Sequence, residues 1–276
     1  MYDRKRQAIV ILVSYYPHYK ESALKYSADI LSKISDKVKI CVVYNTVGAR
    51  SQTTQYDHFI DFELEGSNKG WEFSAWDEGL AHVRQQINIA DDDVLIFAND
   101  TFCHHWPFSS LNVNFISQAI NRASFGEVVG DIKHFKQTIQ LNQVTGDAWM
   151  ASYLLAIHMK DIGLLLPFDK IGCDDDFKAS ILVNHGKVEF ARSCAEIQNH
   201  LSTYMFPTKQ GKGWYNASCK NPELIKLKVN AILNEILLSI TCVQRGGKLV
   251  SFHPQKWMRS LNRFRRKWMA FKRKLS

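Results

Sequence analysis

Apolar and polar positions along the first hundred residues predict strands that alternate with helices. Residues 8–14 form a continuous apolar, largely β-branched run, which is typical of a strand covered on both faces of a mainly parallel sheet. The expected elements of this half are strands at 8–14, 38–44, 58–62 and 94–98 and helices at 21–35 and 74–88. Such alternation predicts an α/β fold, whose ligands gather at the carboxyl ends of the strands.

The second half of the chain is less regular. Its expected elements are strands at 128–132, 137–141 and 187–190, a strand or short helix at 150–158, and a helix at 175–185. A longer helix is expected from Pro222, because Asn221 suits the N-cap, proline suits the first helical position and Glu223 suits the first turn. This helix closes the predicted globular part near Val243.

Charge is distributed unevenly and divides the chain into a body, 1–243, and a tail, 244–276. The 276 residues are 46% hydrophobic and 22% charged, as in a globular protein, with a net charge of +8. Eleven of the 35 basic residues lie in 245–276, which contains no Asp or Glu. The basic balance therefore belongs to the tail, and the rest of the chain has no matching nucleic-acid motif, so we expect no nucleic-acid partner.

The tail has the pattern of an amphipathic helix that binds a membrane surface. Its large apolar residues recur at spacings of four and three and are Trp257, Leu261, Phe264, Trp268, Phe271 and Leu275. Basic residues occupy the other positions, so we expect residues 256–276 to bind an anionic membrane surface. The alternative is a helix that packs back on the body with a solvated basic face.

The spacing of the cysteines and the lengths of the apolar runs indicate the cellular compartment of the protein. The six cysteines contain no C-x-x-C pair, which argues against a disulfide framework or a structural zinc site and favours a reducing cytoplasm. No apolar run approaches the roughly 18 residues needed to span a bilayer. The apolar run after the basic N-terminus is also too short for a signal peptide. Together with the tail, these features predict a cytoplasmic protein that is peripheral on the inner face of the cytoplasmic membrane.

Four stretches carry the candidate chemistry. They are "VSYYP" after the first strand, "NKGWEFSAWDEGLAHV" from Asn68, "LIFANDTF" at the end of the strand 94–98, and "GCDDDFKASILVNHGKVEFARSCAEIQNH" from Gly172. In this order and spacing they resemble the inverting glycosyltransferases of the GT-A fold, especially family 2 and the rhamnan-synthesis rhamnosyltransferases. The resemblance implies a GT-A, Rossmann-like, mainly parallel sheet flanked by helices, with the amphipathic helical tail at its C-terminus.

The resemblance also implies roles for individual residues. Contacts to a nucleotide-sugar donor are expected from Ser14, Tyr15, Asn45, Asn68, Gly70, Asp77, Asn99 and Asp100. Asp100 and His200 are expected to hold Mg²⁺ or Mn²⁺, which suits the charge that develops on a diphosphate leaving group. Asp175 is the expected catalytic base, because its acidic neighbours raise its proton affinity. Trp149 and Asp174 are expected to contact the acceptor.

Several of these residues also have a purely structural interpretation. An Asn-Asp pair after a strand is commonly a turn or a helix cap, and acidic residues at a helix start favour the helix dipole. His200 fits an ordinary surface or core histidine, and Trp149 fits a packing residue. The chain also departs from the family pattern, because Ala98 replaces the first acid of D-x-D, Phe177 replaces a second acid after Asp175, and Asn45 replaces an aspartate.

The sequence therefore predicts an inverting glycosyltransferase that moves a sugar from a nucleotide-sugar donor to a growing bacterial surface polysaccharide. The acceptor is expected to be a glycan or a lipid-linked glycan, which explains why a catalytic body would carry a membrane-binding tail. The alternatives are a retaining or phosphate-releasing transferase on the same fold, and a non-catalytic GT-A-like subunit that binds nucleotide sugar or glycan. The missing acid at Ala98 keeps the second alternative open.

Overall fold

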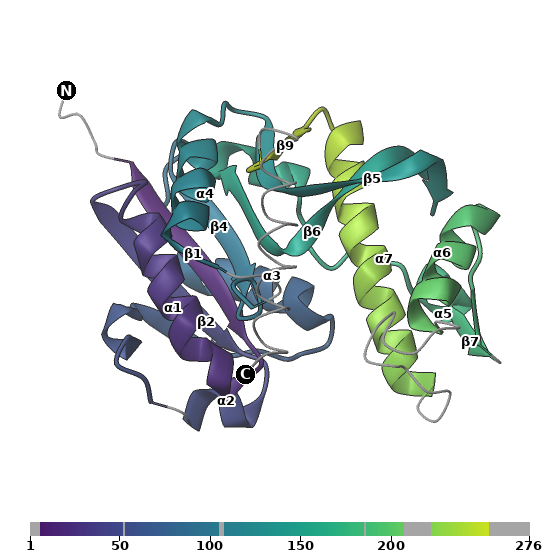
Figure 1. Ribbon diagram of the computed structural model, residues 1–276, viewed down its shortest axis with the longest axis horizontal. Coiled ribbons are helices and arrows are strands. Elements are labelled where there is room, and N and C mark those ends of the chain that lie inside the picture. Colours follow the sequence, from purple (N-terminus) through teal and green to yellow (C-terminus); the bar gives the residue numbers. More distant parts are fainter. Residues whose placement is uncertain (1–5, 52, 105–107, 185, 207–221, 254–276) are drawn as a thin grey trace, which may run out of the picture.

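The structure is a computed structural model and describes residues 6–51, 53–104, 108–184, 186–206 and 222–253 (Figure 1). Its strands are β1 (Gln7–Ser14), β2 (Lys37–Tyr44), β3 (Phe62–Glu65), β4 (Val94–Asn99), β5 (Glu127–Leu141), β6 (Val144–His158), β7 (Leu182–Asn184), β8 (Lys187–Glu189) and β9 (Lys248–Ser251). Its α-helices are α1 (Pro17–Leu31), α2 (Val47–Ser51), α3 (Trp71–Gln86), α4 (Ser110–Arg122), α5 (Asp175–Ser180), α6 (Ala195–Met205) and α7 (Pro222–Gln244). Two 3₁₀ helices, η1 (Asp57–Phe59) and η2 (Met159–Leu164), complete the described elements.

Seven strands form one sheet in the order β3-β2-β1-β4-β6-β5-β9. β1 pairs in parallel with β2 and β4, and β2 pairs in parallel with β3. β6 is antiparallel to both β4 and β5, while β9 is parallel to β5. The sheet is therefore mainly parallel, and the strand order reverses between β1 and β4. The predicted α/β, Rossmann-like architecture with a mainly parallel sheet flanked by helices is confirmed.

The apolar run of β1 builds the core on both faces of this sheet. Ala8, Val10 and Leu12 pack against α1 and α4, whereas the alternate residues Ile9 and Ile11 pack against α3 and α7. This two-sided burial follows from the period of two along a strand. Both faces are thus covered, which leaves the loops at the carboxyl ends of the parallel strands as the place where a ligand is expected to bind.

A third core cluster lies beyond the sheet and is centred on α7. The inner side of α7 buries Leu238 against the sheet, while Val229 and Leu233 pack with α5, α6 and the β7–β8 hairpin. Figure 1 shows α7 standing between the sheet and this smaller group of elements. The arrangement means that residues on α7 lie between the sheet and the acidic start of α5.

The observed elements differ from the expected ones in identifiable places. The strand expected at 58–62 begins at Phe62, because residues 57–59 form η1. The strands expected at 128–132 and 137–141 are one strand, β5, interrupted by a bulge, and residues 150–158 are part of β6. The helix expected at 175–185 ends at Ser180 and is followed by β7.

Helix α7 begins at Pro222 as expected, while Asn221 lies outside the described residues. The sheet continues past the boundary predicted at Val243, because β9 pairs with β5 through Lys248–Ser251. The described body therefore extends at least to Ser251. The amphipathic segment predicted at 256–276 lies outside the described residues. Within the part of the chain that is described, no helix is long and apolar enough to cross a membrane.

Candidate functional site

The loops after β1, β2, β3 and β4 meet at one edge of the sheet and carry most of the residues predicted to bind a donor. Parallel strands place their carboxyl ends together, and the strand order reverses between β1 and β4, the position at which open α/β sheets are expected to have a ligand crevice. Tyr15 follows β1, Asn45 follows β2, and Asp100 follows β4. The structure thus brings three of the four predicted stretches to a common place.

Asp100 connects the loop after β4 to the loop after β1. Its Oδ2 accepts hydrogen bonds from the backbone N–H groups of Tyr15 and Tyr16, each at 2.6 Å, and from Ser14 Oγ at 3.4 Å. The side chain is fully buried, and this burial raises its pKa to about 6. Its other oxygen, Oδ1, is buried without a hydrogen-bond partner among the described residues. One oxygen therefore holds the first loop, and the other is unsatisfied.

Asn99, which precedes Asp100, forms a local turn. Its Oδ1 accepts from the backbone N–H of Thr101 at 3.2 Å and from Thr101 Oγ1 at 2.6 Å. This side-chain turn is the behaviour expected of asparagine at the end of a strand. The structural interpretation of the Asn-Asp pair thus holds for Asn99, whose amide oxygen is already occupied.

Asn45 connects three loops of the crevice. Its Nδ2 lies 2.9 Å from Tyr15 Oη, 3.3 Å from Asn68 Oδ1 and 3.1 Å from the carbonyl oxygen of Trp71. The side chain is 6% exposed, and its Oδ1 has no hydrogen-bond partner among the described residues. A buried acceptor without a partner is costly, typically about 1–3 kcal/mol, so Asn45 Oδ1 is a candidate acceptor for a donor group of a ligand.

The loop between β3 and α3 is held in an unusual conformation. Asn68 and Trp71 have positive φ angles of 53° and 56°, which are uncommon outside glycine. Gly70, between them, allows the loop to approach Asp169, because a β-carbon at Gly70 would lie 2.3 Å from Asp169 Oδ2. The Trp71 ring packs against Tyr15 with 6.0 Å between the ring centres. This loop therefore forms a wall of the crevice.

Asp77, predicted to contact the donor, instead holds the loop that follows η2. Its carboxylate accepts hydrogen bonds from the backbone N–H groups of Phe168, at 3.0 and 3.1 Å, and of Asp169 at 3.2 Å. Asn234 of α7 also holds this loop. Its Nδ2 donates to Phe168 O at 2.7 Å, and its Oδ1 accepts from Ile171 N at 2.9 Å. Burial raises the pKa of Asp77. The loop is thus clamped between α3 and α7.

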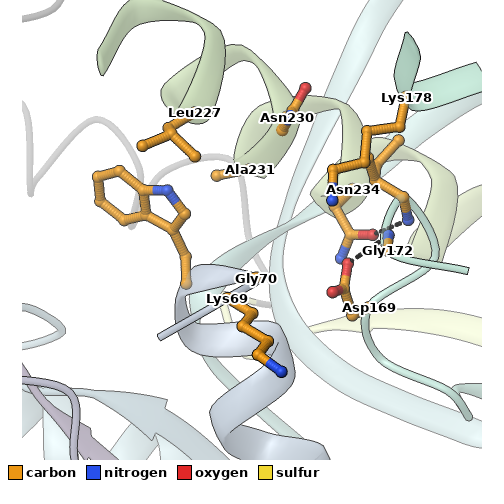
Figure 2. Close-up of a pocket in the computed structure, with 11 residues that line it drawn as sticks. Lys69, Gly70, Asp169, Gly172, Lys178, Leu227, Asn230, Ala231 and Asn234 are labelled. Atoms are coloured by element: carbon orange, nitrogen blue, oxygen red, sulfur yellow. Dashed lines mark hydrogen bonds between the residues drawn. The ribbon is translucent and has the colours of Figure 1, made fainter. Parts of the chain in front are cut away.

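A small cavity lies where the β3–α3 loop, the clamped loop and α7 meet (Figure 2). Its volume is about 60 Å³, and its lining residues include Gly70, Trp71, Gly172, Lys178 and Ala231. A second, larger cleft of about 290 Å³ opens at the ends of β2 and β3 and is lined by Tyr44, Asn45, Thr46, Arg50, Ser51, Glu65 and Gly66. Asn45 lines this larger cleft, which approaches the size range of small-ligand pockets.

The acidic residues at the start of α5 differ in their contacts: Asp174 is hydrogen-bonded and Asp175 is exposed. Asp174 is the N-cap residue and accepts from Phe177 N at 2.9 Å and from Asn142 Nδ2 at 2.9 Å. Its hydrogen bond from Asn142 lowers its pKa. Asp175 is exposed, and no hydrogen bond joins its carboxylate to another described residue. Asp174 thus has the structural role of a cap, and Asp175 is available to solvent.

His200 and Trp149 lie together on the other side of α7 from the crevice loops. Trp149 packs on Phe135 with 4.2 Å between ring centres, and the His200 ring lies 6.4 Å from the Trp149 ring. Burial lowers the pKa of His200. The ring contacts of His200 are with Trp149 and Phe135, and none of the contacts among the described residues joins His200 to Asp100.

The described residues offer few ligands for Mg²⁺ or Mn²⁺. No group of three His, Cys, Asp or Glu side chains in the described part of the chain could hold a metal ion. Mg²⁺ in proteins is often held by one or two carboxylates together with substrate phosphates and water. Asp100 fits that pattern as a single protein ligand, because its Oδ1 is unsatisfied.

Three polar residues beside the crevice were not predicted from the sequence. Ser152 of β6 donates its Oγ–H to Glu72 Oε1 at 2.7 Å and its N–H to Glu235 Oε2 at 2.8 Å. Glu72 is 6% exposed at the start of α3, and burial raises the pKa of Glu235 on α7. A signal was present, because Glu235 is the one charged residue in the apolar stretch "AILNEILLSI".

Comparisons with known proteins find similarity only among solved structures. No protein-family model and no curated protein matches the sequence. One similar structure is a 4-diphosphocytidyl-2C-methyl-D-erythritol synthase, with 13% identity, a TM-score of 0.41, and coverage of 60% of this chain and 79% of that one. A second synthase of this name, from Anaerococcus prevotii, has 11% identity, a TM-score of 0.37 and coverage of 83% and 96%. A mannosyltransferase from Pyrobaculum calidifontis, in complex with GDP-Man and Mn²⁺, has 13% identity and a TM-score of 0.38; the match covers 60% of this chain and about half, 48%, of the mannosyltransferase.

Proposed function

We propose that this chain is a GT-A-type, inverting glycosyltransferase that takes a sugar from a nucleotide-sugar donor. The observation that carries the proposal is the convergence of Tyr15, Asn45 and Asp100 in the crevice where the strand order reverses. Ligands of open α/β sheets bind at this position. Function remains tied to the residues of the site rather than to the architecture, which serves many unrelated activities.

The donor's nucleoside is assigned to the larger cleft beside Asn45. The unsatisfied Oδ1 of Asn45 is an acceptor for a base N–H group, and the amide is held in place by Tyr15 and Trp71. The acceptor glycan is assigned to the side of the smaller cavity, near Trp71 and Gly172. A carboxylate must take the proton of the attacking hydroxyl, and Asp175, exposed at the start of α5, is the carboxylate that the family resemblance assigns to this step.

A divalent cation belongs to the proposal through Asp100. When bound, the cation would neutralise negative charge that develops on the diphosphate. Asp100 Oδ1 is the proposed protein ligand, because it is the carboxylate oxygen of the crevice that lacks a partner. Asp100 Oδ2 independently holds Tyr15 in position for the nucleoside. His200 stays a prediction as a second ligand, and the contacts of the described residues do not support it.

The biological context is proposed from the sequence. The acceptor would be a growing bacterial surface polysaccharide, such as O-antigen or capsule, and the segment 256–276 would bind the protein to the inner face of the cytoplasmic membrane. This placement would bring a donor from the cytoplasm to an acceptor attached to lipid.

The second candidate function is a non-catalytic subunit that binds nucleotide sugar or glycan. The observation that favours it is the use of Asp100 Oδ2 by two backbone N–H groups, combined with Ala98 at the position of the first acid. Such a protein would bind a nucleotide sugar through Asn45 and Tyr15 but would not cleave it, so no nucleoside diphosphate would be produced.

The deciding experiment is a donor screen. The full chain is incubated with UDP-, dTDP- and GDP-sugars in the presence of Mg²⁺ or Mn²⁺, and released nucleoside diphosphate is measured. We expect release with one donor class, loss of release in Asp100→Ala, and normal release in the matched control Asp92→Asn, which changes an exposed acid at the opposite end of β4. If nucleotide raises thermal stability while no donor is turned over, the binding-subunit hypothesis replaces the transferase hypothesis.

A further inference from the structure

Ser152 lies in a bulge of β6 that faces the candidate site. In the β5–β6 pairing, Gly130 is opposite Leu155 while the next residue, Asp131, is opposite Ala151. Residues 152–154 are therefore extra on β6, and such bulges re-aim side chains, often beside active sites. Here the bulge points both polar groups of Ser152 at carboxylates, the Oγ at Glu72 and the backbone N–H at Glu235.

Ser152 joins two carboxylates on different helices, that of Glu72 on α3, which is buried, and that of Glu235 on α7, which is partly buried. Burial and the neighbouring charge of Glu72 both raise the pKa of Glu235. Lys228, two turns before Glu235 on α7, lowers that pKa, and its ammonium group lies 5.2 Å from the centre of the Trp71 ring.

The same part of the crevice contains two buried oxygen atoms that have no partner among the described residues. They are Asn45 Oδ1, in a side chain that is 6% exposed, and Asp100 Oδ1, in a side chain that is fully buried. Both residues contact Tyr15, and Glu72 and Asp100 both raise the pKa of Tyr15, although burial raises it more. The two unsatisfied atoms therefore mark a place for a ligand around Tyr15, which the charge of Glu72 also reaches.

We propose that Glu72 is a catalytic residue of this site, the base that removes the proton from the attacking hydroxyl of the acceptor, with Ser152 and Glu235 as positioning residues. The proposal rests on the proposed glycosyltransferase function and deepens it. As the hydroxyl oxygen forms its bond to the anomeric carbon, its O–H bond breaks and the proton passes to Glu72. The bond from the anomeric carbon to the diphosphate breaks at the same time, and its electron pair leaves with the diphosphate. The proton returns to solvent after the product dissociates.

Glu72 takes the place of Asp175, the base that the family resemblance predicts, because the two carboxylates are held differently. Asp175 is exposed, and its carboxylate is held by no hydrogen bond to another described residue. Glu72 is buried, is oriented by Ser152 Oγ at 2.7 Å, and follows Trp71, a lining residue of the small cavity, in the first turn of α3. A fixed orientation matters because a base must stand within hydrogen-bond reach of the proton that it removes.

The test compares isosteric variants in the full chain with the donor that the screen identifies. We expect Glu72→Gln to lower kcat about 10²- to 10⁴-fold, the usual effect of losing a general base, and to remove the acid limb of the pH profile of kcat. Affinity for the nucleoside diphosphate, measured by calorimetry, should stay within about twofold, because Glu72 is assigned to the acceptor step. Ser152→Ala and Glu235→Gln should move the pH of that limb with smaller losses in kcat.

Glu78→Gln is the matched control, because Glu78 is on the same helix and its half-buried carboxylate accepts from Ser67 Oγ and Ser67 N. Glu78→Gln should have the same kcat and the same pH profile of kcat as the unmodified chain. Full turnover and an unchanged pH profile in Glu72→Gln, with turnover lost in Asp175→Asn, would overturn the inference and leave the proposed function intact. If the unmodified chain releases nucleotide from none of the donors, both the proposed transferase function and the role of Glu72 are wrong. Thermal melting curves show whether Glu72→Gln is folded. If it is not, the pH profiles of kcat for Ser152→Ala and Glu235→Gln test the inference instead. Profiles identical to that of the unmodified chain would refute it.

Discussion

Replacing Asp100 by asparagine should stabilise the protein at neutral pH, although it removes a fully buried carboxylate. Asparagine has nearly the same shape and still offers an oxygen to the backbone N–H groups of Tyr15 and Tyr16. It carries no charge, so the cost of burying an ionised group disappears. Asp100→Ala has the opposite effect, because it leaves both N–H groups without a partner.

The magnitude follows from the pKa. Burial raises the pKa of Asp100 to about 6, against an ordinary value of 3.8. The folded state therefore binds this proton more tightly than the unfolded state does. The resulting stabilisation is fully present below pH 3.8 and is lost as the pH rises through 6, and it amounts to about 3 kcal/mol. Asp100→Asn should thus match the unmodified chain near pH 3.8 and exceed its free energy of unfolding by up to about 3 kcal/mol at pH 7.

The assay is urea denaturation of the unmodified chain and both variants at a series of pH values from 4 to 7.5. The difference between the unmodified chain and Asp100→Asn isolates this carboxylate from all others. At pH 7, Asp100→Ala should be less stable than Asp100→Asn by about 2–4 kcal/mol, because two buried N–H groups lose their acceptor. A difference between the unmodified chain and Asp100→Asn that does not change with pH would refute the reasoning.

Three further variants test other contacts of the site. Asn45→Ala removes the proposed acceptor for the base and should weaken nucleoside diphosphate binding about tenfold by calorimetry, equivalent to about 1.4 kcal/mol; unchanged affinity would exclude the larger cleft. Gly70→Ala places a β-carbon 2.3 Å from Asp169 Oδ2 and should lower the free energy of unfolding by about 1–3 kcal/mol in urea titrations, whereas an unchanged midpoint would show that the loop can move away. Asp77→Ala leaves the N–H groups of Phe168 and Asp169 without an acceptor and should cost about 2–4 kcal/mol, with proteolysis of this loop as a second measurement.

The parallel half of the fold was predictable because its signals are local. The run of β1 alternates residues between two buried faces, so its apolar continuity already implies cover on both sides. Helix α4 was not predicted, although Ser109 and Asn112 form a capping box at its start. Strand β9 was not predicted either, because its four residues lie in a basic segment and their pairing with β5 depends on contacts about 120 residues away.

The positions of the site residues were more predictable than their roles. The sequence places Asp100 at the end of a strand, but its main partners, Tyr15 and Tyr16, lie 85 and 84 residues earlier and are brought to it only by the pairing of β1 with β4. Glu72 and Ser152 are likewise 80 residues apart and meet because a bulge in β6 turns Ser152 toward α3. A carboxylate that binds a backbone N–H and one that binds a ligand look the same in a sequence. Only the hydrogen-bond partner distinguishes them. The unsatisfied oxygen of Asp100 and the hydrogen bond from Ser152 to Glu72 could therefore be identified only from the three-dimensional structure.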